Sequence, residues 1–306
     1  MIDVRVSHSE ADDLRSLEIY NAVWPHDAFA LEDANAFKAS LLAADDYLAS
    51  VDAIDVGSAF IGIRPQRPDV AYAPITVLPD HRRCGVGTAL YEAVSSWAAA
   101  HGVDALEAAV DEDDAESLGF AERRGFTAVE RSSRLVLDLT DIEPPEIAPP
   151  PGVEIVTWAE RPELARGMYD VACETYPDIP GQEQDLLEPF EDWLAHDMSA
   201  AGDRPEATFV ALAGDEVVGF AKFSLTTARP EVAFHDITGV RRAWRGRGIA
   251  GALKRAQIAW AKRAGYELLQ TGNEVRNTPI RRLNERLGYK PAVGRIFVRG
   301  PLSGGA

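Results

Sequence analysis

The chain has 306 residues, of which 46% are hydrophobic, and a formal net charge of −18. This length suits two domains of roughly 150 residues, and the acidity argues against a nucleic-acid-binding protein. No apolar run approaches the ~20 residues of a membrane span, and the start lacks a signal-peptide pattern. The two cysteines imply neither a disulfide framework nor a zinc cluster. We therefore expect a cytoplasmic protein without a metal site.

The first half predicts a helical region near 10–50, strands at 47–65 and 70–78, and a helix at 87–100. An apolar strand at 135–139 ends this half. The first half carries most of the negative charge of the chain, because residues 1–150 contain 28 Asp and Glu against 11 Lys and Arg. A solvated acidic surface is the simplest interpretation of that charge.

A proline-rich linker at 141–152 cannot form a helix and separates the two halves. We expect an N-terminal domain at 1–140 and a C-terminal domain at 153–306. The second half predicts helices and strands in the following order: a strand at 153–158, helices at 162–174 and 186–198, strands at 207–212, 216–224 and 231–240, a helix at 248–264, a strand at 268–271, a helix at 277–285 and a strand at 294–299.

A turn dense in glycine and arginine follows the strand at 231–240 and begins the next helix. The first turn of a helix has free N–H groups and a dipole that favours negative charge. Gly246 and Gly248 would let a phosphate approach the backbone, and Arg245 and Arg247 would add charge-assisted contacts. We expect a phosphorylated ligand at this turn.

The same pattern occurs 163 residues earlier in the chain. Residues 82–90 match 245–253 without a gap, and the register holds as far as the Gly-aromatic pairs at 125–126 and 288–289. A gapless repeat about 50 residues long, with a period too long for a solenoid unit, indicates two copies of one domain.

The two turns resemble the signature of the GNAT superfamily of acyl-CoA-dependent N-acyltransferases, which is Arg or Gln, two residues, Gly, one residue, then Gly or Ala. Two triplets satisfy it: Arg82, Gly85 and Gly87, and Arg245, Gly248 and Ala250. The chain therefore resembles a tandem GNAT, the arrangement also found in the mycothiol synthase family. The implied fold class is α/β (α+β), with two domains that each contain a mixed, mostly antiparallel sheet flanked by helices.

The resemblance implies that acetyl-CoA (coenzyme A) binds at the second turn. Its pyrophosphate would lie on the backbone N–H groups, and its pantetheine arm would run beside the strand at 231–240. The residues expected to bind it are Val240, Arg242, Arg245, Gly246, Arg247, Gly248, Ile249, Ala250 and Asn277. A second site is expected at Arg82, Gly85 and Gly87.

Transfer to an amine requires a base, because an alkylamine has a pKa near ~10.4. The strand before the second turn offers Asp236 and His235, which alternation places on opposite faces. A structural role for either residue stays open. In many GNAT enzymes a tyrosine five residues before the closing aromatic protonates the leaving thiolate. This chain has Asn284 there, which can form a hydrogen bond but cannot supply a proton.

The first half lacks these groups. At the repeat offset, Asp236 becomes Ala73, His235 becomes Tyr72 and Asn284 becomes Ala121, while Asn277 becomes Asp114. We therefore expect the C-terminal domain to catalyse, and the N-terminal domain to bind the cofactor weakly or only to support the fold.

The expected function is transfer of an acetyl group from acetyl-CoA to a primary amine of a small molecule. Attack would be direct, because no nucleophilic cysteine or serine arrangement is evident. Acidic residues before the first hairpin of the second half could attract a cationic amine or form an ordinary wet helix face: Asp170, Glu174, Asp178, Glu183 and Asp185.

Two alternatives stay open, an acetyltransferase for protein or peptide amines and a non-catalytic acyl-CoA-binding regulator. We expect neither nucleic acid nor membrane as a partner, and a monomer or a homodimer.

Overall fold

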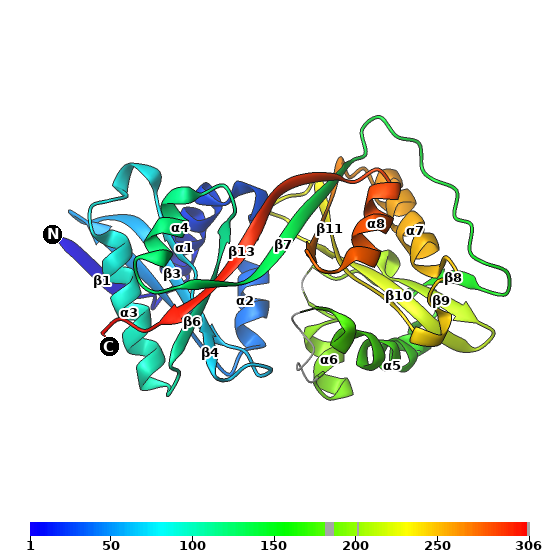
Figure 1. Cartoon of the computed structure of the whole chain (residues 1–306), viewed down its shortest axis with the longest axis horizontal. Helices are drawn as coiled ribbons and strands as arrows, with labels where there is room; N and C mark the ends of the chain where they lie inside the picture. The colour runs from blue at the N-terminus through cyan, green and yellow to red at the C-terminus, as the bar shows by residue number, and fades with distance from the viewer. Residues whose placement is uncertain (181–186, 201, 305–306) are drawn as a thin grey trace. The chain divides into compact units, whose positions relative to one another are not determined.

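A computed structural model describes residues 1–180, 187–200 and 202–304. The chain forms two compact units: unit 1 comprises residues 1–131 and 295–306, and unit 2 comprises residues 132–294 (Figure 1). These bounds differ from the expected division at 1–140 and 153–306. The difference arises because the last strand of each half pairs within the other unit.

Unit 1 contains a sheet with the strand order β1-β2-β3-β4-β6-β13, and β5 pairs with β3 beside β4. All its neighbours are antiparallel except β4 and β6, which run parallel. Its elements are β1 (Ile2–Val6), α1 (Glu10–Val23), α2 (Leu31–Ala39), β2 (Ala43–Val51), β3 (Ile54–Ile63), β4 (Val70–Tyr72), β5 (Ile75–Val77), α3 (Val86–Ala100), β6 (Ala105–Asp111) and α4 (Ala115–Glu122), with part of β7 (Thr127–Asp138) and of β13 (Lys290–Pro301).

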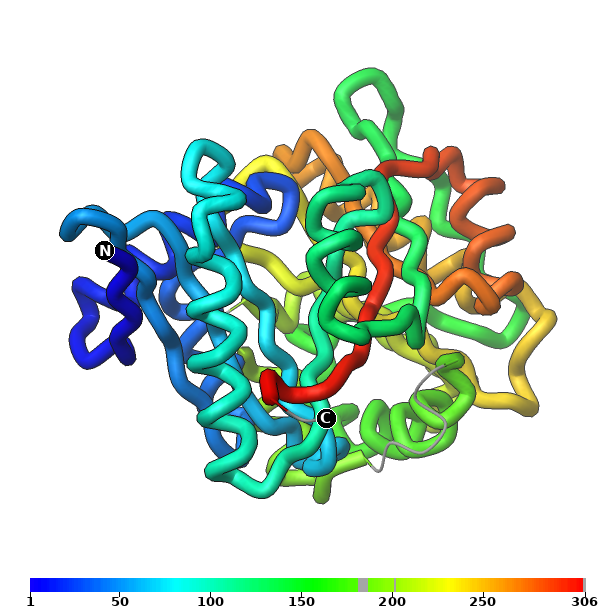
Figure 2. Tube along the Cα trace, turned by 60° about the vertical axis from the view of Figure 1, so that its left-hand side comes forward, coloured from blue at the N-terminus to red at the C-terminus, as the bar shows by residue number. Residues whose placement is uncertain are grey.

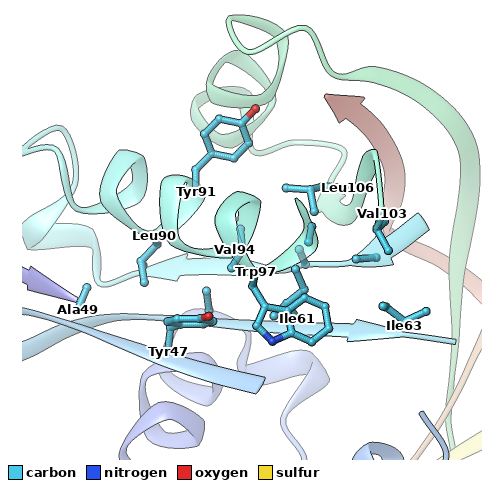
Figure 3. Packing of buried hydrophobic residues seen from close by; sticks show 14 of the residues in the cluster. Tyr47, Ala49, Ile61, Ile63, Leu90, Tyr91, Val94, Trp97, Val103 and Leu106 are labelled. Atoms are coloured by element: carbon cyan, nitrogen blue, oxygen red, sulfur yellow. The ribbon is translucent and has the colours of Figure 1, made fainter. Parts of the chain in front are cut away.

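Helix α3 supplies the core of unit 1. Leu90, Val94 and Trp97 repeat at helical spacing and point toward the strands, where they pack with Ile61 (Figure 3). Tyr91 projects from α3 in a different direction (Figure 3). The face of α3 with Leu90, Val94 and Trp97 therefore packs on the strands, whereas Tyr91 points toward another part of the unit.

Unit 2 contains a sheet with the strand order β7-β12-β11-β10-β9-β8, in which β11 and β12 are the parallel pair. Helices α5 and α6 lie on one side of this sheet, and α7 and α8 lie on the other (Figure 1). The remaining elements are β8 (Glu154–Thr157), α5 (Ala165–Thr175), α6 (Phe190–His196), β9 (Phe209–Ala213), β10 (Glu216–Leu225), β11 (Val232–Val240), α7 (Ile249–Ala264), β12 (Leu268–Glu274) and α8 (Thr278–Arg286).

Side chains along β10 alternate between the two helical layers. Phe220 packs with residues of α5, whereas Ala221 and Phe223 pack with residues of α7. The period of two is that of a strand buried on both faces. It places Lys222 on the α5 side of the sheet.

The last strands of the two halves are exchanged. In β7, Leu135 pairs with Thr271 of β12, and in β13, Arg295 pairs with Asp111 of β6. The C-terminal residues, red in Figures 1 and 2, thus run beside β6 of unit 1. Each sheet is completed by a strand that lies far away in the sequence from its neighbour.

The predicted fold class is confirmed: both units are mixed α/β structures with mostly antiparallel sheets. The predicted helical region near 10–50 is wrong beyond residue 40, because Ala43–Val51 forms β2 between β1 and β3. Alanine and aspartate do not favour strands, so pairing with two neighbours overrides local propensity here. The predicted helix at 186–198 corresponds to α6, and Leu186 lies outside the described residues. None of the described helices is both long and apolar enough to cross a membrane.

Candidate functional site

The two glycine-arginine turns have the same backbone geometry. Gly85 and Gly248 precede α3 and α7 with φ/ψ of 95°/−10° and 91°/0°. In both turns the signature arginine donates from Nε to the carbonyl at the end of the preceding strand, at 3.2 Å for Arg82 and 2.9 Å for Arg245. These arginines therefore fix the turn through Nε, and a terminal nitrogen of each contacts a carboxylate, that of Glu116 for Arg82 and that of Asp178 for Arg245.

The second turn has an open backbone. Gly246 and Gly248 have φ of 76° and 91°, and a Cβ at either would meet nothing within 4 Å. Such glycines let an anion approach the helix N-terminus closely. In unit 1 the position equivalent to Gly246 is Arg83, whose φ of 64° is left-handed for a residue with a side chain. Strained backbone of this kind often occurs at functional sites.

Asp178 neutralises part of the second turn. Its carboxylate accepts from Arg242 at 2.7 and 2.9 Å and lies 2.7 Å from Nη2 of Arg245. The hydrogen bond from Arg242, with that from Arg245, lowers the pKa of Asp178 to about 2. Glu174 also accepts from the N–H of Arg242, at 2.5 Å. Two of the acidic residues considered for the acceptor thus contact the second glycine-arginine turn.

The other acidic residues contribute less to a site. Asp170 lies 3.7 Å from Arg166 on the same helix, as a surface pair does. Glu183 and Asp185 lie outside the described residues.

Three of the other predicted cofactor-binding residues, Arg247, Ile249 and Ala250, belong to the second turn or to the first residues of α7. Arg247 lies over the ring of Trp244, with 4.6 Å from its guanidinium carbon to the ring centroid. Ile249 is buried, whereas Ala250 is half-buried at the start of α7. Asn277 precedes α8, and its side chain makes no capping hydrogen bond. Its predicted contact with a pantetheine arm stays a prediction.

Strands β11 and β12 separate beside this turn. Their parallel pairing runs from Val232 to His235 and goes no further. At the same place β11 has a bulge against β10: Lys222 pairs with Ile237 and Phe223 with His235, so Asp236 is the extra residue. The bulge presents Asp236 where the two strands diverge.

Asp236 belongs to a charged cluster on the α5 side of the sheet. Lys222 Nζ lies 2.9 Å from the Asp236 carboxylate and 2.8 Å from that of Asp203. The side chains of Lys222 and Asp203 are each 4% exposed, whereas that of Asp236 is 37% exposed. Lys222 Nζ also donates to the carbonyl of Asp197. Two carboxylates share one ammonium, and of the two it is that of Asp236 which is accessible.

His235 lies on the opposite face and is buried. Its ring nitrogens contact Gln257 Oε1 at 3.0 Å and the hydroxyl of Tyr289. Burial holds the pKa of His235 well below its usual range. A neutral, enclosed imidazole fits a structural role better than that of a base for an incoming amine.

Asn284 is fully buried on α8. Its amide donates to Asn273 Oδ1 at 2.8 Å, and its own Oδ1 has no hydrogen-bond partner among the described residues. Tyr289, which closes the motif, is 3% exposed and packs in the core. Asp236 therefore lies on the opposite face of the sheet from His235, and Asn284 comes from α8, on the side of His235.

A cavity of about 420 Å³ lies in unit 1 and includes the first turn. This volume is within the ordinary range of small-ligand sites. It extends along β5 and reaches the other end at Tyr20, Tyr72 and Arg295. The half of the chain expected to be degenerate thus contains a ligand-sized cavity, while Ala73 stands where unit 2 has Asp236.

Arg295 is a cavity residue that sequence reasoning missed. It lies on β13, and its Nη2 is 2.7 Å from Asp27. An arginine in a strand near the C-terminus gives no local signal of a site, and only the strand exchange brings it into unit 1.

Comparison with known proteins finds one family in both halves of the chain. The model of the "Acetyltransferase (GNAT) family" matches residues 13–126 and 165–289. A mycothiol acetyltransferase from Nocardiopsis dassonvillei is 28% identical over 272 residues, which cover 79% of this chain and 78% of that protein. An L-2,4-diaminobutyric acid acetyltransferase from Nocardia farcinica is 35% identical over 103 residues, which cover 30% of this chain and 53% of that protein.

Solved structures share the fold over the whole chain. A tandem GNAT protein from the clavulanic acid biosynthesis pathway matches with a TM-score of 0.80 at 19% identity, covering 100% of both chains. A GCN5-related N-acetyltransferase from Sphaerobacter thermophilus matches with a TM-score of 0.76 at 21% identity, covering 100% of this chain and 97% of that one. With two family matches and two equivalent turns, the chain belongs to the GNAT family of acetyltransferases and carries that family's domain twice.

Proposed function

We propose that the protein transfers an acetyl group from acetyl-CoA to a primary amine of a small molecule. Both curated relatives bear the names of acetyltransferases, and one name specifies L-2,4-diaminobutyric acid, a small molecule with two amines. In unit 2, the second turn supports acetyl-CoA as the acyl donor, and the bulge at Asp236 supports an amine as the acceptor.

The donor end suits the pyrophosphate of acetyl-CoA. Gly246 and Gly248 leave the start of α7 open to an anion, and the terminal nitrogens of Arg242 and Arg245 already hold a carboxylate there. A diphosphate offers more acceptor oxygens to the same donors than Asp178 does. The pantetheine arm would extend from this turn to the opening between β11 and β12.

The acceptor end suits a cationic amine, and Asp236 is the observation that carries the proposal. Its accessible carboxylate lies at the bulge, next to a buried cluster with more carboxylates than ammonium groups. Such a site attracts an ammonium group by charge. It also offers a carboxylate that accepts the proton as the amine attacks the thioester.

We assign the chemistry to unit 2 and a second acyl-CoA site to the cavity of unit 1. In unit 1 the positions equivalent to Asp236 and Ile237 are Ala73 and Pro74, both of which line the cavity. Neither can take a proton. The cavity is large enough for part of a ligand, so binding there without turnover is the expected behaviour.

The test combines an amine screen with three variants. Release of free thiol from acetyl-CoA is measured with small amines and with lysine peptides. Asp236→Asn is expected to lower kcat about 100-fold with little change in acetyl-CoA affinity. Arg245→Ala is expected to reduce turnover more than Arg82→Ala does, and equal losses would contradict the assignment to unit 2. Transfer to peptides alone, or tight binding without any transfer, would refute the proposal for small amines.

A further inference from the structure

A buried lysine on α7 lies next to Tyr289 and near His235, the last residue of β11 that pairs with β12. Lys254 is 1% exposed, and no carboxylate among the described residues pairs with it. Its Nζ lies 5.6 Å from the ring centroid of Tyr289. Burial lowers the pKa of Lys254 to about 7. An ammonium group held in this way is costly to the fold, and such groups often serve a function.

Further unsatisfied polar atoms come from the elements around it. Gln257 Nε2, one turn along α7, and Asn284 Oδ1, on α8, are buried without a hydrogen-bond partner among the described residues. The titratable groups nearby are His235 of β11, on which the charge of Lys254 acts, and Tyr289. Polar groups left unpaired from two helices indicate a site that a ligand completes.

The repeat relates these residues to the cavity of unit 1. At the offset of 163, Lys254 corresponds to Tyr91, Asn284 to Ala121 and Tyr289 to Phe126. Tyr91, Ala121 and Phe126 all line that cavity.

The contact between the helix residue and the closing aromatic residue is also repeated. In unit 1 the ring centroids of Tyr91 and Phe126 lie 6.0 Å apart, and in unit 2 Lys254 Nζ lies over the ring of Tyr289. The position of Tyr91 projects away from the strands that Leu90 and Val94 face (Figure 3). Lys254 therefore occupies, in unit 2, the position equivalent to a wall residue of the unit 1 cavity, where unit 1 has a phenol.

Lys254 and Asp236 lie on opposite faces of the sheet at one opening. Asp236 is on the α5 side with Lys222, whereas Lys254 is on α7, next to Tyr289 and His235. An acceptor that enters from the α5 side would attack a thioester in the opening, and the sulfur would leave toward α7. The two faces thus offer separate groups for the two proton transfers.

We propose that Lys254 donates the proton that the departing sulfur of coenzyme A takes up, an inference that rests on the proposed function. The amine nitrogen forms a bond to the acyl carbon, the bond from that carbon to sulfur breaks, and its electron pair goes to sulfur. The attacking nitrogen loses a proton to the Asp236 carboxylate, while the Lys254 ammonium protonates the thiolate. Both groups then exchange protons with water, so charge and atoms balance over the cycle.

The ammonium is a better-matched acid than a tyrosine for this step. A thiol has a pKa of about 8.5, so a proton moves downhill from an ammonium of lower pKa to the thiolate. General acid catalysis of this kind contributes about 100-fold or more. In unit 1, the Tyr91 hydroxyl donates a hydrogen bond to the carbonyl of Pro301, at 2.8 Å.

The experiment compares wild-type protein with Lys254→Met and Lys254→Leu, and uses Lys262→Met as the matched control. Lys262 lies on the same helix and contacts the carbonyls of Leu139 and Thr140. The rate kcat is measured from pH 6 to 9 with an amine that the wild type acetylates. Binding of acetyl-CoA is measured by calorimetry, and thermal unfolding shows that each variant is folded.

We expect both Lys254 variants to lose about 100-fold in kcat at pH 6.5, with acetyl-CoA affinity within about threefold of wild type. The ratio of wild-type to variant kcat should fall as pH rises above 7, because neutral lysine cannot donate. A loss that is equal at every pH, a loss below threefold, or acetylated Lys254 in the mass spectrum would overturn the inference. If wild-type protein acetylates no amine, the proposed function itself fails, which is a separate result.

Discussion

The ammonium nitrogen of Lys222 lies 2.9 Å from the carboxylate of Asp236, although the lysine side chain is 4% exposed and the aspartate side chain is 37% exposed. The pair thus connects the interior of unit 2 with its accessible surface. Asp203 contacts the same ammonium from the buried side, at 2.8 Å. The nearby carboxylates raise the pKa of Lys222 against the effect of burial, so the lysine stays charged. The cluster holds the bulge residue of β11 in place.

Removing this cation should destabilise unit 2. Lys222→Met leaves the buried Asp203 carboxylate without its partner, so we expect a loss of about 3–5 kcal/mol in the free energy of unfolding at pH 7. Burial raises the pKa of Asp203, so the loss should be smaller at pH 5, where that carboxyl takes up a proton more readily. Urea denaturation at both pH values measures it. The control is Lys290→Met on the exposed start of β13, and a loss no greater than in the control would contradict the expectation.

Asp178 should compete with the anionic ligand of the second turn. Its carboxylate occupies the terminal nitrogens of Arg242 and Arg245, which the pyrophosphate of acetyl-CoA would also need. Asp178→Asn is therefore expected to tighten acetyl-CoA binding about two- to fivefold, the modest range of exposed ion pairs. Isothermal titration calorimetry at low and high salt measures the change. Unchanged or weaker binding would mean that Asp178 supports the site instead.

The turns could be predicted from sequence because glycine is the residue that adopts left-handed backbone without strain. Gly85 and Gly248 stand where α3 and α7 begin, and their spacing from Arg82 and Arg245 defines the motif. Helix α7 likewise follows from its periodicity and from Gly265 as its C-cap. Local chemistry determines these features, so a local pattern reveals them.

The partner of a strand is not local information. Nothing in β7 or β13 indicates that each pairs in the other unit, so Arg295 could not be placed at the cavity. The contact of Asp178 with the second turn is not local information either, since Asp178 precedes Arg242 by more than 60 residues in the sequence. Lys254 is different: the repeat already aligned it with Tyr91, but a lysine beside a basic turn suggests a surface charge until its burial is known.

Lys254 should make stability depend on pH in a specific direction. Its folded-state pKa of about 7 lies below the ~10.4 of an unfolded chain. The unfolded state therefore binds the proton more tightly between these values, and the penalty is fully present below pH 7. Stability of the wild type relative to Lys254→Met should rise with pH above 7, by at most about 1.4 kcal/mol per unit. Urea denaturation of both proteins from pH 6.5 to 9.5 tests this, and parallel curves would contradict it.

The strand exchange makes the C-terminus necessary for unit 1. Val298 of β13 is 5% exposed and packs with Val110 and Ala121, residues that precede it by more than 170 positions. Val298→Asp would bury an unpaired carboxylate in that cluster and should cost more than 3 kcal/mol. Hydrogen exchange followed by mass spectrometry should then show faster exchange in peptides of β6 and α4 than in wild type.

Peptides of α7 and β10, which lie in unit 2, provide the internal reference for the same sample. Thr127→Asp, at an exposed position of β7, is the matched surface control. If β6 stayed as protected in Val298→Asp as in wild type, the pairing of Arg295–Pro301 with β6 would not be what holds that edge of the sheet. Protection lost equally in both units would instead indicate that they unfold together, which the exchange of strands permits through β7.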